Sequence, residues 1–267
     1  MINKISEEII ASLNNCEKDF IYSSLEIANS GPNSNSPYRF WFNDFKNNFN
    51  NRAGDVYEFG VFRGASLISI ALIAKRFNSK KHFWGFDTFE GFPSLSKMDD
   101  LKNFSEVFGF SEKQIEDVNL LSKIRLNKED LKEKDLNHSL TKLGKSGLFK
   151  ETSYENLLEK IEKFSLKNIT LVKGEFKETV YKHFSDKKRK VFSANIDCDL
   201  YEGYKVCLPS VFDNLEKGGF INLDEYYSLK YPGPKIATDE FLKVNKDAIL
   251  KENDTSQNEF GRFYITK

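Results

Sequence analysis

The chain has 267 residues, with 40 lysines and arginines balancing 40 aspartates and glutamates, so its formal net charge is zero. This balance argues against a protein that coats nucleic acid, which would carry a clustered basic excess. The 25 phenylalanines and 11 tyrosines supply a sizeable core, whereas no segment has the roughly 20 apolar residues of a membrane-spanning helix. We therefore expect a cytoplasmic, globular protein that binds neither nucleic acid nor membrane.

The first part of the chain, residues 1–53, has the periodicity of helices. Apolar residues recur at helical spacing from Ile5 to Leu13, and an aromatic run covers residues 38–49. Between them, the segment GPNSNSP at 31–37 predicts a loop. We expect a helical cap, and its aromatic run leaves two alternatives: packing against the chain's own sheet, or against a partner subunit in a homo-oligomer.

An alternation of strands and helices begins at residue 55. Short apolar segments predict strands at 56–59, 82–87, 168–172, 190–197 and 219–224. Helical segments between them include 65–76, 201–216 and 234–244, and residues 248–266 are typical of a closing hairpin strand. Such an alternation predicts an α/β fold with a doubly wound, mostly parallel, Rossmann-like sheet.

This alternation is interrupted between residues 94 and 150, where the sequence is polar and highly charged. A long insertion inside a compact domain is usually functional or mobile. We expect it to form a helical lid over the site, so that residues 1–267 make a single domain.

The loop after the first predicted strand has the composition of a ligand cradle. Gly60 and Gly64 permit close approach of the backbone to a ligand, and the next helix offers free N–H groups. By itself the pattern is weak, because two glycines after a strand often mark only helix–strand packing. It also lacks the three-glycine dinucleotide fingerprint and the lysine of a phosphate-binding loop.

A carboxylate at the end of the second predicted strand strengthens this interpretation. Asp87 follows the glycine loop by about 25 residues, at a position where a carboxylate accepts hydrogen bonds from a ribose. The alternative is that Asp87 only caps the turn at 87–91. A glycine loop with a ribose carboxylate, but without a diphosphate fingerprint, favours S-adenosylmethionine over NAD.

Carboxylates also gather at the ends of two later strands. Asp224 follows Asp197 by 27 residues, which is one strand–helix–strand unit. Such strands are neighbours about 4.8 Å apart, so Asp197, Asp224 and Glu225 are expected to converge. Clustered carboxylates repel each other unless a cation neutralises them, and an all-oxygen set favours Mg²⁺, with Mn²⁺ or Ca²⁺ as alternatives.

These acidic residues also have simpler explanations. Asp199 lies where the N-cap of the helix at 201–216 belongs, and aspartate is a preferred cap, so we assign Asp199 to that role. Asp197 and Asp224 have the alternative of being solvated acids at strand ends.

Six segments in this order resemble the macrocin O-methyltransferase family of S-adenosylmethionine-dependent sugar O-methyltransferases. They are VYEFGVFRGAS (56–66), FDTFEGFP (86–93), VKGEFKET (172–179), IDCDLYEG (196–203), GGFINLDEY (218–226) and KIATDEF (235–241). Any one of them is degenerate, but their order and spacing match from residue 54 to about 243. The resemblance implies a class I methyltransferase sheet in an enzyme that methylates sugar hydroxyls on bacterial natural products.

The resemblance also implies roles for individual residues. Those it places at the cofactor, from the methionine end to the adenine, are Glu58, Gly60, Arg63, Gly64, Ser66, Asp87, Gly174, Glu175 and Phe176. Arg63 would lie near the cofactor's carboxylate and Asp87 would hold the ribose. Asp197, Asp224 and Glu225 would hold Mg²⁺, with Asp197 also a candidate general base. Families of this kind usually have a second aspartate at the position of Glu225.

The predicted reaction is therefore methyl transfer to a hydroxyl of a sugar or glycosylated small molecule, the acceptor being a natural-product sugar or a polysaccharide precursor. Two alternatives remain open. A metal-dependent glycosyltransferase would use the Asp197-x-Asp199 motif, although the glycine loop and the second acidic pair fit it poorly. A non-catalytic homologue would bind the cofactor without turnover.

Overall fold

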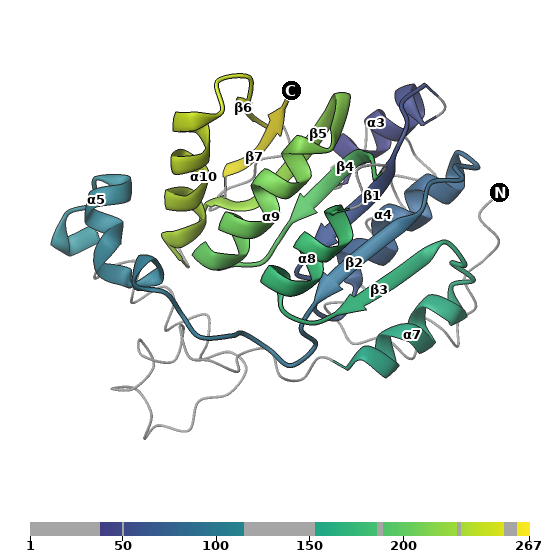
Figure 1. Ribbon diagram of the computed structural model, residues 1–267, viewed down its shortest axis with the longest axis horizontal. Helices are drawn as coiled ribbons and strands as arrows, with labels where there is room; N and C mark the ends of the chain where they lie inside the picture. Colours follow the sequence, from purple (N-terminus) through teal and green to yellow (C-terminus); the bar gives the residue numbers. More distant parts are fainter. Residues whose placement is uncertain (1–37, 50, 115–152, 186–188, 229–230, 254–260) are drawn as a thin grey trace.

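The computed structural model describes residues 38–49, 51–114, 153–185, 189–228, 231–253 and 261–267. Within them, a seven-stranded sheet has the order β3-β2-β1-β4-β5-β7-β6 (Figure 1). Its strands are β1 (Asp55–Phe59), β2 (Phe83–Asp87), β3 (Ile169–Lys173), β4 (Val191–Ile196), β5 (Leu215–Tyr227), β6 (Ile249–Glu252) and β7 (Gly261–Thr266). The first five strands in this order, from β3 through β2, β1 and β4 to β5, pair in parallel, whereas β7 is antiparallel to β5 and β6. This arrangement confirms the predicted doubly wound sheet with a C-terminal hairpin.

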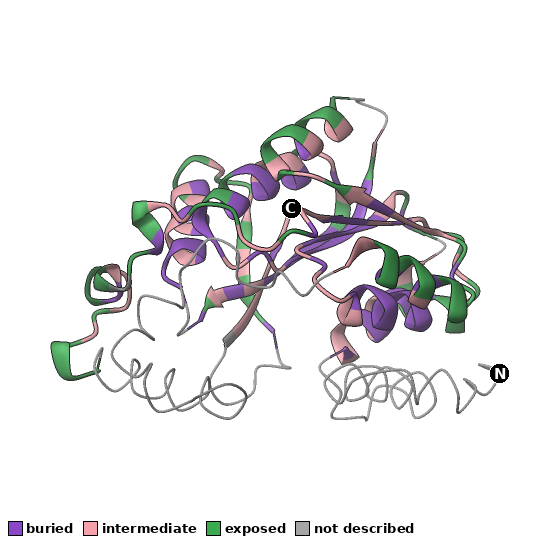
Figure 2. Ribbon diagram, turned by 90° about the horizontal axis from the view of Figure 1, so that it is seen from below, coloured by how far each residue is buried: buried purple, intermediate pink, exposed green. Residues whose placement is uncertain are grey.

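Helices cover both faces of this sheet (Figure 1). One face carries α3 (Arg39–Asn48), α4 (Ala65–Arg76) and α7 (Tyr154–Lys163), and the other carries α8 (Phe176–Phe184), α9 (Tyr201–Asp213) and α10 (Gly233–Val244). Each set of helices buries a separate apolar core against the sheet. Figure 2 shows the buried residues concentrated along the strands and on the helix sides that face them.

Strand β4 illustrates why the centre of the sheet is apolar. All six of its residues are buried, because helices cover both faces of a central parallel strand. Its sequence, VFSANI, nevertheless contains Ser193 and Asn195. A buried polar side chain is costly unless it forms hydrogen bonds. Asn195 forms them with Glu58 and Asn222, whereas the Ser193 hydroxyl has no hydrogen-bond partner among the described residues.

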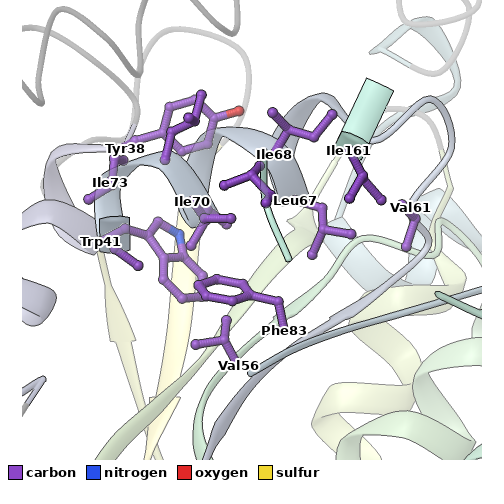
Figure 3. Close-up of a cluster of buried hydrophobic side chains, with 14 of the residues drawn as sticks. Tyr38, Trp41, Val56, Val61, Leu67, Ile68, Ile70, Ile73, Phe83 and Ile161 are labelled. Atoms are coloured by element: carbon purple, nitrogen blue, oxygen red, sulfur yellow. The ribbon is translucent and has the colours of Figure 1, made fainter. Parts of the chain in front are cut away.

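The aromatic run before β1 packs against the chain's own sheet, which was one of the two predicted alternatives. Phe45 of α3 stacks on Phe192 of β4 with ring centroids 5.3 Å apart, and Trp41 meets Phe220 of β5 edge to face. Figure 3 shows part of this core, in which Trp41 of α3 and Phe83 of β2 belong to the same cluster of buried side chains. Full burial of such a side chain stabilises the fold by about 1.5–3 kcal/mol.

The boundary between α9 and β5 differs from its prediction. The helix expected at 201–216 ends at Asp213, and the strand expected at 219–224 extends from Leu215 to Tyr227. The polar segment after Leu215 has the composition of a helix end. Leu215 is instead buried and pairs with Val191, and the register shifts after this pair.

The insertion after β2 is described only in its first part. Residues 97–108 form η2 (Lys97–Asp99), η3 (Leu101–Asn103) and α5 (Phe104–Phe108). The rest of the predicted lid, residues 115–152, and most of the predicted N-terminal cap, residues 1–37, lie outside the described residues. No helix in the described part of the chain is long and apolar enough to cross a membrane.

Candidate active site

A cavity of about 400 Å³ lies where the carboxyl ends of the parallel strands meet. Its walls come from the loop after β1, the ends of β2, β4 and β5, the start of α3, and Arg262 of β7. The predicted cofactor residues that line it are Gly60, Arg63, Ser66, Asp87 and Phe176. Asp197 and Asp224 line it as well. The cavity therefore joins both predicted sites.

The two loop glycines are required by the protein's own packing. Gly60 has a φ of +86°, and a Cβ atom there would lie 1.8 Å from the carbonyl oxygen of Asp197. Gly64 has a φ of +81°, and its Cβ atom would lie 2.2 Å from a methyl group of Leu157 in α7. Gly60 thus lets the loop after β1 lie directly against the loop after β4, whereas Gly64 lies outside the cavity lining and serves helix packing.

Asp87 holds the glycine loop in place. Its Oδ2 atom accepts hydrogen bonds from the backbone N–H groups of Val61 and Phe62, at 2.8 and 2.9 Å. Its Oδ1 atom accepts from the N–H group of Phe89 at 2.8 Å, which is the predicted turn cap. A carboxylate accepts about four hydrogen bonds, so three backbone donors leave little capacity for the ribose contact that the sequence also predicts.

Glu58 is 1% exposed and does not line the cavity itself, whereas its hydrogen-bond partner Asn195 does. Its Oε1 atom accepts a hydrogen bond from Asn195 Nδ2 at 2.8 Å, and its Oε2 atom is buried without a hydrogen-bond partner among the described residues. The pKa of Glu58 is raised to about 7, chiefly by burial and also by the charges of Asp224 and Asp87, while the Ser66 hydroxyl and the Asn195 amide act in the opposite direction. The buried carboxyl is thus poised near neutrality.

On the predicted adenine side, one of three residues lines the cavity. Phe176 does so and contacts Phe59 edge to face. Gly174, with a φ of +141°, donates its N–H group to the carbonyl oxygen of Asp87 at 3.0 Å. Glu175 is exposed and pairs with Lys177. Gly174 and Glu175 therefore shape the turn before α8.

The structure brings three carboxylates together, but not the predicted three. Oxygen atoms of Asp197, Asp199 and Glu225 lie within 4.8 Å of one another. Glu225 is 3% exposed and accepts a hydrogen bond from the Tyr204 hydroxyl at 2.8 Å. Burial raises the pKa values of Asp197 and Glu225, and each is raised further by the neighbouring carboxylates. We call these three residues the carboxylate cluster.

Asp224 lies beside the carboxylate cluster but has another partner. Its carboxylate pairs with the guanidinium of Arg262, which also donates to the Asp224 carbonyl oxygen at 2.8 Å. Arg262 belongs to β7, which returns antiparallel beside β5. The predicted convergence of Asp197 with Glu225 is therefore observed, and Asp224 is held by an arginine 38 residues further along the chain.

The predicted capping role of Asp199 is wrong. The N-cap of α9 is Leu200, and the backbone N–H group of Tyr201 donates to Asp99 Oδ1 at 2.8 Å. Asp99 belongs to the insertion and is 4% exposed. Because the insertion supplies the cap, the Asp199 carboxylate joins the cluster instead; its backbone has a φ of +59°.

Comparison with known proteins identifies the family. The profile of the macrocin O-methyltransferase (TylF) family matches residues 46–162 and 132–255. The chain belongs to this family. It is an O-methyltransferase, as the resemblance of its segments predicts, which disfavours the glycosyltransferase alternative. A search of curated proteins gave no significant match.

Solved structures show the same fold for this O-methyltransferase. The crystal structure of CalS11, a calicheamicin methyltransferase, has 18% identity and a TM-score of 0.59, over 95% of this chain and 93% of that chain. The O-methyltransferase NovP has 20% identity and a TM-score of 0.57, over 85% of this chain and 78% of that chain. The likeness establishes a Rossmann-like class I methyltransferase fold.

Several cavity residues of the O-methyltransferase escaped the sequence analysis. Asn195 and Asn222 line it from β4 and β5, Tyr38 and Trp41 from the N-terminal end of α3, and Arg262 from β7. The asparagines could have been found from the sequence, because each lies between apolar residues, in the segment ANI of β4 and the segment FINL of β5. Arg262 carries none, since its partner is set only by the antiparallel return of the chain.

Proposed function

We propose that this O-methyltransferase transfers the methyl group of S-adenosylmethionine to a hydroxyl group of a sugar or glycosylated small molecule. The observation that carries the proposal is a single cavity with two kinds of wall. The glycine loop and Asp87 form one wall, and Asp197, Asp199 and Asp224 form the other. A donor on the first wall would face an acceptor hydroxyl at the second. The sugar class rests on the family resemblance.

The first wall is proposed to hold the cofactor. When bound, S-adenosylmethionine supplies a methyl group that its positively charged sulfur already activates. Arg63 would pair with the cofactor's carboxylate and Phe176 would lie beside the adenine; both residues line the cavity, which supports these assignments. Glu58 does not line the cavity, but its Oε2 atom is buried without a hydrogen-bond partner among the described residues, so we assign that atom to the cofactor's amino group. Asp87 would offer its remaining acceptor capacity to the ribose.

The carboxylate cluster, which shares Asp197 and Asp199 with the second wall, fits a divalent cation. Three carboxylates within 4.8 Å of one another, two of them with raised pKa values, are destabilised by mutual repulsion until a positive charge joins them. Their all-oxygen chemistry matches Mg²⁺, with Mn²⁺ or Ca²⁺ as alternatives. We assign Asp197, Asp199 and Glu225 as ligands; the predicted ligand Asp224 would first have to leave Arg262. When bound, Mg²⁺ would lower the pKa of an acceptor hydroxyl.

The chain's own groups do the remaining work. Asp197 is our candidate general base, because it lines the cavity and its backbone lies directly against Gly60 of the cofactor loop. It would accept the proton that the acceptor hydroxyl loses on methylation. Holding the two reactants in line is worth roughly 7–11 kcal/mol in well-oriented systems, so positioning is expected to supply most of the acceleration.

Calorimetric titration of the purified protein tests the proposal. S-adenosylmethionine and S-adenosylhomocysteine are each titrated with Mg²⁺ present and after chelation, and polyol and sugar acceptors are then screened for methylation with Mg²⁺. We expect both nucleosides to bind at micromolar concentration irrespective of Mg²⁺, and turnover to require it. Absence of nucleoside binding in both conditions would refute the cofactor assignment. Full turnover after chelation would refute the metal assignment.

A further inference from the structure

A row of three buried polar side chains crosses the centre of the sheet. Glu58 of β1 lies opposite Asn195 of β4, which in turn lies opposite Asn222 of β5. Their exposed fractions are 1%, 5% and 8%. The next residues along these strands, Phe59, Ile196 and Leu223, are fully buried and apolar. Three polar groups in such surroundings are costly unless each one is satisfied.

The hydrogen bonds along this row have a direction. Asn222 Nδ2 donates to Asn195 Oδ1 at 2.8 Å, and Asn195 Nδ2 donates to Glu58 Oε1 at 2.8 Å. An asparagine amide has donors at one end and an acceptor at the other. Because Asn222 occupies the acceptor end of Asn195, the donor end must face Glu58. The row therefore presents a hydrogen-bond donor to the carboxylate and favours its charged form.

The row ends at an atom that still lacks a partner. Glu58 Oε2 is buried and has no hydrogen bond within the part of the chain that the structure describes. The charges that act most strongly on Glu58 are two further carboxylates, Asp224 and Asp87. A buried carboxyl among other carboxylates either keeps its proton or needs a cation beside its charged form. The cationic amino group of the methionine part of S-adenosylmethionine has the matching charge and donors.

We propose that Asn195 and Asn222 are positioning residues, which hold Glu58 so that its Oε2 atom receives the amino group of the cofactor. This inference rests on the proposed function, because it needs S-adenosylmethionine as the ligand. It adds that cofactor recognition depends on a hydrogen-bonded row reaching from β1 to β5, the strand that also carries Asp224 and Glu225.

The test compares two ligands that differ by the group in question. S-adenosylhomocysteine carries the amino-acid part, whereas 5′-methylthioadenosine has the same adenosine and thioether but lacks it. Asn195→Asp is nearly isosteric and replaces the donor by an acceptor, which repels the Glu58 carboxylate. We expect its affinity for S-adenosylhomocysteine to fall about ten- to a hundred-fold, the scale of a hydrogen bond to a charged group. Its affinity for 5′-methylthioadenosine should stay within about two-fold.

A second variant tests the direction of the row. Asn222→Asp removes the donor that orients Asn195, without touching Glu58 itself. We expect its affinity for S-adenosylhomocysteine to fall about three- to ten-fold, which is less than in Asn195→Asp. Its affinity for 5′-methylthioadenosine should again change little. Asn168→Asp is the matched control, since Asn168 donates to the Lys81 carbonyl oxygen outside the cavity. It should bind both ligands as the unmodified protein does, and circular dichroism verifies that each variant is folded.

A pH series separates positioning from mere packing. The groups that act on Glu58 include Asp87 of β2, Asp224 of β5, Ser66 of α4 and the Asn195 amide. In Asn195→Asp, two adjoining acids share a proton, so binding of S-adenosylhomocysteine should need a higher pH than in the unmodified protein. Binding of 5′-methylthioadenosine should show no such displacement.

Each outcome decides a separate claim. Equal losses for both ligands in Asn195→Asp would overturn the inference, because they indicate a structural role only. Unchanged affinity for S-adenosylhomocysteine in that variant would overturn it as well. If the unmodified protein bound neither ligand, the proposed function itself would fail, and the positioning role with it.

Discussion

The two walls of the cavity are built in different ways. The cofactor wall is local: Asp87 binds the backbone of Val61, Phe62 and Phe89, all close to the ends of β1 and β2. The acidic wall is assembled from distant parts of the chain, because Asp99 caps α9 and Arg262 pairs with Asp224. The first wall can therefore be recognised in the sequence as a motif, whereas the second depends on how distant segments pack together.

The largest effect is expected on the acidic wall. Asp197→Ala should lower methyl transfer by about 10²–10⁴-fold, the range for loss of a general base. Affinity for S-adenosylhomocysteine should remain nearly intact, because the cofactor wall does not need the Asp197 carboxylate. Product formation by mass spectrometry and calorimetry check the two statements. Turnover at the unmodified rate would remove Asp197 from both the base and the metal assignment.

The contact between the walls should be the next most sensitive point. Gly60→Ala places a methyl group 1.8 Å from the Asp197 carbonyl oxygen at a φ of +86°. We expect the free energy of unfolding to fall by about 2–5 kcal/mol, from overpacking together with left-handed strain. Gly218→Ala is the matched control, because its φ is +78° but nothing lies within 4 Å of the added atom. Urea unfolding of both variants should show a loss of only about 1–2 kcal/mol for the control.

The metal assignment predicts different effects on Mg²⁺ affinity for substitutions of Asp199 and Asp224. Asp199→Asn removes a member of the carboxylate cluster, so its Mg²⁺ affinity should fall by about ten-fold or more. Asp224→Asn should have a smaller effect, since Arg262 already neutralises that carboxylate. Calorimetric titration with Mg²⁺ ranks the variants without any need for turnover. A larger loss for Asp224→Asn would restore the ligand set expected from the sequence.

On the cofactor wall, Glu58 should make binding depend on pH. Its pKa near 7 means that the carboxyl is mostly protonated below neutrality and cannot pair with an amino group. Affinity for S-adenosylhomocysteine should therefore fall about ten-fold per pH unit below 7, and Glu58→Gln should remove this dependence. The raised pKa has the opposite effect on the stability of the unliganded protein. Its free energy of unfolding should decrease as the pH rises toward 7, because the folded state must then give up a proton that it binds more tightly than the unfolded state does. Urea unfolding and calorimetry across pH 5–8 measure both trends.

The smallest effect is expected where the insertion meets the acidic wall. Asp99→Ala removes the cap of α9 and should cost about 0.5–2 kcal/mol of stability. Asp99 binds the backbone of Tyr201, two residues after Asp199. Mg²⁺ affinity should therefore also weaken, while S-adenosylhomocysteine binding is unaffected. Asp99→Asn, which keeps an acceptor oxygen, should recover most of both losses. Asp100→Ala changes the exposed neighbouring acid and serves as the control.

The sequence by itself determined the α/β fold, the position of the glycine loop and the family. Apolar segments such as 56–59 and 190–197 are strands because both faces of a central parallel strand are covered, and that requirement is visible residue by residue. Gly60 and Asp87 lie at strand ends, so their place at the cavity follows from strand order alone. Asp197 and Glu225 converge for the same reason.

Only the tertiary structure decided the partners of the remaining polar groups. Asp199 was assigned to a helix cap on local spacing, but a residue about a hundred positions earlier, Asp99, occupies that role. The pairing of Arg262 with Asp224, and the row from Asn222 through Asn195 to Glu58, likewise join segments far apart in the chain. Local patterns report the periodicity of one element, whereas a hydrogen bond or ion pair between elements depends on which of them the fold brings within about 3 Å.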